Sequence, residues 1–222
     1  MVAGTGHDFL SRHSCSDAIF IRTSLLKNIE WDINDTKGFG HPEGNVKFGA
    51  GIVFSEAHKS AADLDRFVSS GWASTVGVVG WAIGGGHGPF APSKGLGVDN
   101  ILAAEIVTAN GSLITVNATG QYSDLYWAIR GGGGSNWGIF TSITYRAHTI
   151  PDGGFTSFSG VWNGNFCKES GSLLDSLIDN YLSWTYNLDT TFGGLAIFLP
   201  IRSEDQAATC GGTWLALVLY HY

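Results

Sequence analysis

The feature that most constrains the fold is a glycine-rich stretch from Thr75 to Gly88, T-V-G-V-V-G-W-A-I-G-G-G-H-G. Its glycines interrupt an apolar run that would otherwise form a buried strand or helix, and glycine weakens both kinds of element. The pattern favours backbone that passes close to a bulky group, with several N–H groups turned toward it. It therefore indicates a cradle for an anionic or flat ligand, while a glycine-rich loop between packed elements explains it equally well.

Composition limits the classes of partner. The 222 residues suffice for one large domain or one and a half smaller ones, and 44% hydrophobic against 14% charged residues indicates a globular chain. A net charge of −7 with only 12 Lys and Arg argues against nucleic acid as a partner, because such binding needs clustered cations. No apolar run approaches the roughly 18 residues that cross a bilayer, so we expect no membrane partner.

The cysteines and histidines show no metal-binding spacing. Three cysteines lie far apart without a C-x-x-C pair, which leaves at least one thiol free, and no H-E-x-x-H is present. We therefore expect no metal site. Three N-x-S/T sequons, at Asn34, Asn110 and Asn117, would be usable in a secretory pathway, although no signal peptide opens the chain.

Hydrophobic periodicity predicts alternating short elements. Ser55 is the predicted N-cap of the clearest helix in the first half, and Asn110-Gly111 predicts a tight hairpin. The predicted helices are 55–69, 124–129 and 172–184. The predicted strands lie within 18–30 and at 45–51, 101–107, 112–116, 138–147, 155–162, 194–199 and 213–222.

The pattern breaks at Ile150-Pro151-Asp152-Gly153-Gly154, which predicts a domain boundary there. At the amino end, the turn from Gly4 to Arg12 has no predicted element before it to pack against. At the other end, the apolar strand of 213–222 has nothing to cover its edge. We expect parts of the protein to be missing on both sides.

Several catalytic classes lack their motifs. The chain has no complete G-x-G-x-x-G and no G-K-[ST], which disfavours an ordinary NAD site and ATP hydrolysis. The nearest match to G-x-S-x-G, at 133–137, ends in Trp137 instead of glycine, which disfavours a serine hydrolase.

Four segments together resemble the flavin-binding half of the FAD-linked oxidases of the berberine-bridge-enzyme-like, vanillyl-alcohol-oxidase type. These are G-T-G-H-D-F-L, the glycine-rich stretch, S-K-G-L-G-V-D-N-I-L-A-A-E-I-V-T-A-N-G and D-L-Y-W-A-I-R-G-G-G-G-S-N-W-G-I-F-T-S-I-T-Y, in the family's order. The resemblance implies an α+β fold. A PCMH-type FAD-binding domain would occupy residues 1–151, followed at 152–222 by the start of an antiparallel-sheet substrate domain.

The resemblance also assigns cofactor residues. His7, after Gly6 in the G-H-D turn, falls where the family attaches the flavin 8α carbon covalently. Ala73 stands where doubly linked members carry cysteine, so one link is the maximum. The residues that would surround the pyrophosphate and flavin edge are Thr75, Val76, Gly77, Val78, Gly84, Gly85, Gly86 and His87. The rest of the cofactor would lie against Gly97, Asp99, Asn100 and Val107.

The implied activity is oxidation of an alcohol, sugar or related organic substrate, with hydride passing to flavin N5 and oxygen as the acceptor. Family resemblance also implies secretion or the secretory pathway. The family's proton-abstracting residues find no match here, so the catalytic base is unknown. Two other hypotheses stay open: a truncated non-catalytic remnant, and a glycine-rich binding module without flavin.

Overall fold

The computed structural model describes residues 1–134, 136–157, 161–165, 172–201 and 211–215. The chain divides into two compact units, Met1–Pro151 and Asp152–Tyr222, each described here by itself. Helices and antiparallel sheets together make the α+β, PCMH-type architecture that the sequence predicted.

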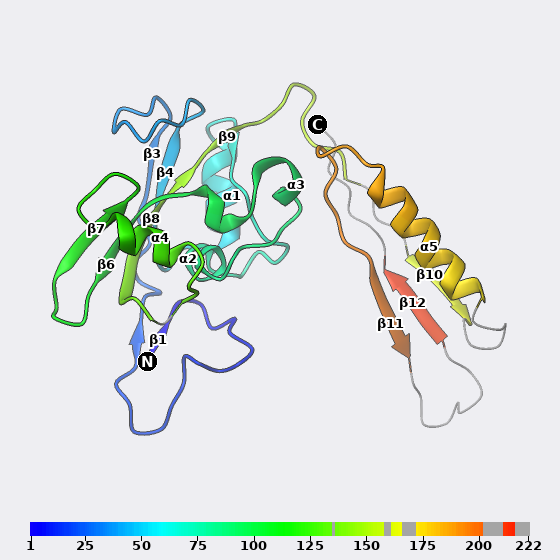
Figure 1. The fold of residues 1–222 in the computed structure, drawn as a ribbon, viewed down its shortest axis with the longest axis horizontal. Coiled ribbons are helices and arrows are strands. Elements are labelled where there is room, and N and C mark those ends of the chain that lie inside the picture. Colours follow the sequence, from blue (N-terminus) through cyan, green and yellow to red (C-terminus); the bar gives the residue numbers. More distant parts are fainter. Residues whose placement is uncertain (135, 158–160, 166–171, 202–210, 216–222) are drawn as a thin grey trace. The chain divides into compact units, whose positions relative to one another are not determined.

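A five-stranded antiparallel sheet organises the first unit, in the order β3-β4-β8-β6-β7 (Figure 1). Its strands are β3 (Ile29–Asp32), β4 (Asn45–Gly49), β6 (Ile101–Val107), β7 (Leu113–Asn117) and β8 (Ile139–Arg146). The β6–β7 pairing, with Val107 opposite Leu113 and Gly111 at φ +82°, confirms the predicted hairpin. Side chains alternate across a strand, so the sheet has one apolar and one polar face.

The apolar face packs against helices. Val46 and Phe48 of β4 and Ile143 and Tyr145 of β8 have 0% of their surface exposed, within one core cluster. Fully burying each such side chain stabilises the fold by about 1.5–3 kcal/mol. The helices of this unit are α1 (Phe54–Ala62), α2 (Val78–Ile83), α3 (Ala91–Lys94), the 3₁₀ turn η1 (Gly97–Asn100) and α4 (Ser123–Ile129).

The helix predicted over 55–69 is shorter and starts earlier. Val53, not Ser55, is its N-cap, because the Glu56 carboxylate accepts a hydrogen bond from Val53 N at 3.0 Å. The helix cannot continue to residue 69, since Asp65 has φ +52° and the chain then forms β5 (Arg66–Phe67). That strand pairs with β9 (His148–Thr149), so tertiary pairing overrides local helix propensity.

The amino end also differs from expectation. An element does precede the Gly4–Arg12 turn: β1 (Val2–Ala3) pairs in parallel with β2 (Ile21–Arg22). The region 18–30 therefore holds the two-residue β2 and the start of β3 instead of one longer strand.

The second unit contains a three-stranded antiparallel sheet in the order β10-β12-β11, together with α5 (Ser172–Tyr186). Its strands are β10 (Val161–Asn165), β11 (Ile197–Ile201) and β12 (Gly211–Leu215). β10 and β11 begin and end later than predicted, and β12 begins two residues earlier. The predicted strand beyond residue 215 lies outside the described residues. Among the helices that are described, none is long and apolar enough to cross a membrane.

Candidate functional site

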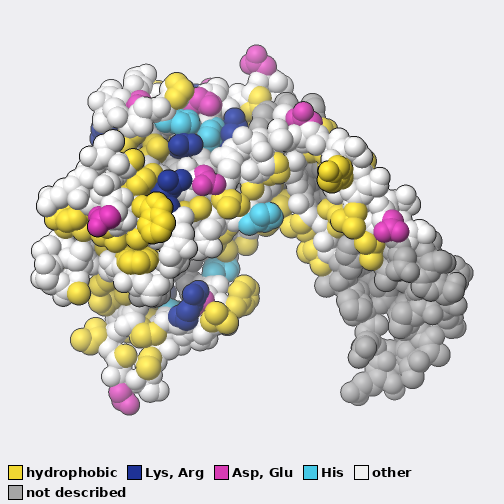
Figure 2. Space-filling view, viewed as in Figure 1, with side chains coloured by type: hydrophobic (Ala, Val, Ile, Leu, Met, Phe, Trp, Pro, Cys, Tyr) yellow, Lys and Arg dark blue, Asp and Glu magenta, His cyan; other side chains and the backbone are white. Residues whose placement is uncertain are grey.

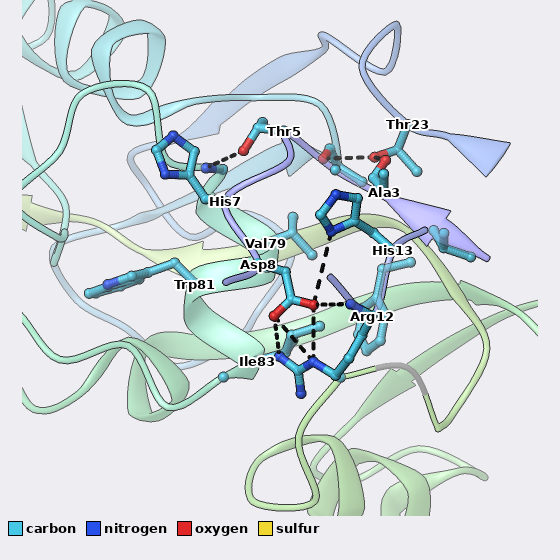
Figure 3. Close-up of a pocket in the computed structure, with 18 of the residues that line it drawn as sticks. Ala3, Thr5, His7, Asp8, Arg12, His13, Thr23, Val79, Trp81 and Ile83 are labelled. Carbon is cyan, nitrogen blue, oxygen red and sulfur yellow. Dashed lines mark hydrogen bonds and ion pairs between the residues drawn. The ribbon is translucent and has the colours of Figure 1, made fainter. Parts of the chain in front are cut away.

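The first unit contains a cavity of about 930 Å³, formed where segments distant in sequence converge (Figure 3). The amino-terminal turn forms one wall, α2 with the residues before it forms another, and the glycine-rich segment leading into β8 completes it. The lining residues are those of 1–9, Arg12, His13, Thr23, Ala50, Val76, Gly77, Val79, Gly80, Trp81, Ile83, Gly84, Gly133, Gly134, Asn136, Gly138, Ile139 and Phe140.

The His7 turn is joined to the glycine-rich stretch by two hydrogen bonds. Gly77 N donates to Thr5 Oγ1 at 3.0 Å, and His7 Nε2 lies 2.9 Å from Thr75 Oγ1. A side chain at Gly77 would press on Thr5, whose methyl carbon lies 3.0 Å from the position of a Cβ. His7 is exposed to the cavity, and the Thr75 contact leaves its Nδ1 unengaged within the described part of the chain.

Helix α2 presents bare backbone to the cavity. Val78 and Ala82 are buried in the core, whereas Gly80 and Gly84, one turn apart, line the cavity. A Cβ on Gly80 would meet nothing within 4 Å. The first-turn N–H groups of Val79 and Gly80 donate no hydrogen bond to the described residues. This side of the helix can therefore receive a flat or anionic group.

Other predicted cradle donors are already used. Gly77 N bonds Thr5, Val78 N donates to Ile52 O at 3.0 Å, and Gly84 N donates to Gly80 O at 3.3 Å. These N–H groups are hydrogen-bonded within the protein, so they are not available to a ligand. These three residues remain predicted cofactor contacts, although their N–H groups are already bonded within the protein.

Several glycines lie against the chain's own Trp81. An added Cβ would lie 2.8 Å from the indole at Gly71 and 3.0 Å at Gly86, and would overlap the ring at Gly97. Gly86 O also accepts a hydrogen bond from Gly97 N at 2.7 Å. The bulky group that these glycines approach is therefore the partly buried Trp81 side chain of the protein itself, which also lines the cavity.

The predicted cofactor residues fall into two sets. The structure brings Gly6, His7, Val76, Gly77 and Gly84 to the cavity. The others do not line it: Thr75, Val78, Gly85, Gly86, His87, Gly97, Asp99, Asn100 and Val107.

Asn100, one of the predicted cofactor residues that do not line the cavity, holds neighbouring backbone in place. Its Nδ2 donates to Lys94 O and Leu96 O at 3.0 and 2.8 Å, and its Oδ1 lies 2.8 Å from His148 Nε2. It is 0% exposed and holds the turn before β6. Its role in this structure is to satisfy buried polar groups.

Sequence reasoning missed the ionisable cavity side chains of Asp8, Arg12 and His13 (Figure 3). Arg12 Nη2 donates to Asp8 Oδ1 at 2.8 Å, and this hydrogen bond lowers the pKa of Asp8 to about 2. His13 Nδ1 is buried without a hydrogen-bond partner in the described residues, 4.0 Å from Asp8 Oδ2. The D-F-L-S-R-H run after His7 was the available signal.

A family model described as an FAD binding domain matches residues 1–117. The chain therefore belongs to the FAD binding domain family. It is 41% identical over 165 residues to the FAD-linked oxidoreductase ZEB1 of Gibberella zeae, covering 72% of this chain and 28% of that protein. A second curated relative, the FAD-linked oxidoreductase malF of Malbranchea aurantiaca, is 44% identical over 153 residues, and 26% of its length is covered.

Solved structures share the fold. Berberine bridge enzyme from Eschscholzia californica superposes with a TM-score of 0.81 at 23% identity, over 100% of this chain and 40% of that one. The VAO-type flavoprotein MtVAO615 from Myceliophthora thermophila superposes at 0.77 with 25% identity, over 96% and 37%. Homologues are thus FAD-linked oxidoreductases, and this chain spans little more than a quarter of the two curated relatives named above.

The glycines of the cavity fit an FAD. Gly6, Gly80 and Gly133 all line it, and a Cβ on any of them would meet no atom within 4 Å. Packing within the protein therefore does not require glycine at Gly80, whereas a bound isoalloxazine or pyrophosphate would occupy the space that a side chain would fill.

Proposed function

We propose that the protein binds FAD in the 930 Å³ cavity and belongs to an oxidase acting on an alcohol, sugar or related small organic substrate. The observation that carries the proposal is the convergence of His7, the open face of α2 and the segment 133–140 on one cavity. When bound, the flavin would accept hydride from the substrate at N5 and pass the electrons to oxygen.

His7 would attach the cofactor covalently. Its Nε2 lies 2.9 Å from Thr75 Oγ1, and in the tautomer in which Nε2–H donates to that hydroxyl oxygen, Nδ1 would carry the lone pair that joins the flavin 8α carbon. That carbon would lose a proton as the N–C bond forms, and the two electrons left on the flavin would pass to oxygen. A second link has no nucleophile, since Ala73 carries only a methyl group. Thr75 thus contributes by orienting His7, although it does not line the cavity itself.

The ligand-facing surface of α2 would hold the rest of the cofactor. The N–H groups of Val79 and Gly80 are donors without a protein acceptor among the described residues, as an anion requires. Phe140 and Ile83, which both line the cavity, would supply apolar contact. Arg12, paired with Asp8, adds a positive charge at the rim.

Residues 152–222 would begin the substrate domain. Their antiparallel sheet and helix α5 support this assignment, with the boundary at Pro151. The sequons at Asn34 and Asn110, both exposed, favour passage through the secretory pathway.

The test is covalent flavin content. Protein purified with FAD present is precipitated with acid, and we expect the yellow colour to stay in the pellet of the parent and to move to the supernatant for His7→Ala. His58→Ala is the matched control, because that histidine lies on α1 and does not line the cavity, so the variant should retain covalent flavin. Release of all flavin from the parent would refute attachment, and no FAD binding at all would refute the cofactor assignment.

A further inference from the structure

A cluster of metal-ligating side chains lies apart from the cavity, at the other end of the β4–β8 strand pair. His41 and Glu43 belong to the loop before β4, and His148 belongs to β9. Each offers one ligand atom, and these atoms all lie within 4.8 Å of one another. The cavity is instead reached by Ala50, after β4 ends, and by Ile139 and Phe140, where β8 begins.

Hydrogen bonds fix which nitrogen of His148 carries a proton. Asn100 donates through Nδ2 to two backbone carbonyls, so its Oδ1 is the atom that faces His148 Nε2 at 2.8 Å and must accept from it. The proton of the neutral ring therefore sits on Nε2. His148 Nδ1 then presents a lone pair, and it points at Glu43 Oε1 across 4.0 Å.

The other two side chains are held in the same way. His41 Nδ1 lies 3.0 Å from Gly44 O, a carbonyl that can only accept, which leaves the lone pair on Nε2. Glu43 Oε2 accepts from Thr149 N at 2.6 Å, which leaves Oε1 for another partner. The two imidazole rings meet edge to face, with centroids 5.4 Å apart.

This arrangement leaves two acceptors, His148 Nδ1 and Glu43 Oε1, facing each other with no proton between them. Outer hydrogen bonds that fix the tautomer and orientation of ligating histidines and carboxylates are typical of metal sites. We propose that His41, Glu43 and His148 bind one divalent transition-metal ion, with zinc the best match to two imidazoles and one carboxylate.

The geometry requires only a small adjustment. Around tetrahedral zinc with bonds of about 2.0–2.1 Å, neighbouring ligand atoms are about 3.4 Å apart. The 4.0 Å gap between His148 Nδ1 and Glu43 Oε1 must therefore close slightly. His148 is 4% exposed and fixed, whereas His41 and Glu43 are partly exposed on a loop and can move toward it.

Two nearby cationic side chains should lower the affinity for the metal ion. The charges of Lys94 and Arg146 act on His148, and one carboxylate offsets only part of the charge of a divalent ion. We therefore expect weaker binding than in zinc sites with four protein ligands.

Figure 2 shows histidine side chains beside acidic and basic ones near the upper edge of the first unit. The ion would tie the loop before β4 to β9, since the ligands come from both.

The test uses the 222-residue chain without a histidine tag, stripped with a chelator and dialysed. Zinc binding is measured by competition with a chromophoric chelator, and cobalt binding by its visible ligand-field spectrum. We expect one equivalent of metal and a zinc-dependent rise in melting temperature. His41→Gln and Glu43→Gln, at partly exposed positions, should each lower zinc affinity at least about tenfold.

His58→Gln is the matched control, because this histidine lies on α1 outside the cluster and its replacement should leave zinc affinity unchanged. Circular dichroism of the apo variants checks that each has folded. Absence of stoichiometric zinc in the parent would overturn the proposal. Equal zinc affinity in the parent, His41→Gln and Glu43→Gln would overturn it as well, since the metal would then lie elsewhere.

Discussion

Replacing Gly80 by alanine separates what the fold requires from what the cofactor requires. Gly80 lies inside α2, is exposed, and has nothing within 4 Å of an added Cβ. Alanine in a helix interior is more favourable than glycine by about 0.5–1 kcal/mol. Gly80→Ala should therefore raise the free energy of unfolding of the protein without FAD by about that amount.

The same substitution should lower the affinity for FAD. The new methyl group would stand in the cavity and beside a free N–H group, and forcing an extra carbon into an occupied site costs about 1–3 kcal/mol. FAD affinity should fall roughly five- to a hundredfold, because 1.4 kcal/mol corresponds to a factor of ten. Flavin fluorescence titration measures the affinity in the His7→Ala background, where no covalent bond can form, and urea unfolding without FAD measures the stability.

Gly131→Ala is the control. Gly131 is exposed, has no positive φ and meets nothing within 4 Å, but it does not line the 930 Å³ cavity. We expect its FAD affinity to match that of the parent. A Gly80→Ala protein that is less stable than the parent, or that binds FAD equally tightly, would refute the reasoning.

Two further predictions concern a buried glycine and a charge. Gly86→Ala should destabilise the protein by about 2–4 kcal/mol, since φ is +75° and the Cβ would lie 2.6 Å from the backbone of Gly97. Gly111→Ala, with φ +82° and open space around the Cβ, should cost only about 1–2 kcal/mol. Equal losses of stability in urea unfolding would contradict this. Because Arg12 lowers the pKa of Asp8 to about 2, the ion pair should persist as pH falls through 4 and be lost toward pH 2. Its stabilising effect should be fully present above the unfolded pKa of about 3.9. Carboxyl NMR titration checks this, and an Asp8 midpoint that is unshifted in the parent, or that stays low in Arg12→Gln, would count against it.

Local patterns were enough to predict much of the sheet. The alternation of Val46 and Phe48 and the Asn110-Gly111 turn depend on neighbouring residues alone, and β4 and the β6–β7 hairpin followed from them. The helix after Val53 was predicted too long for the opposite reason. Its end is set by β5 pairing with β9, a partner about eighty residues further on, which no local window contains.

For the cavity and the metal-ligand cluster too, the local sequence was informative about some features and only the tertiary structure about others. The glycine pattern from Thr75 to Gly88 was enough to predict that backbone passes close to a bulky group. Only the tertiary structure decided what is approached: Trp81 for Gly86 and Gly97, and open cavity for Gly80. Likewise, the positions of His41 and Glu43 in the sequence do not predict a metal site. The pairing of β4 with β8 brings His148, two residues after β8, beside them, because contacts between distant segments are set by packing and not by spacing along the chain.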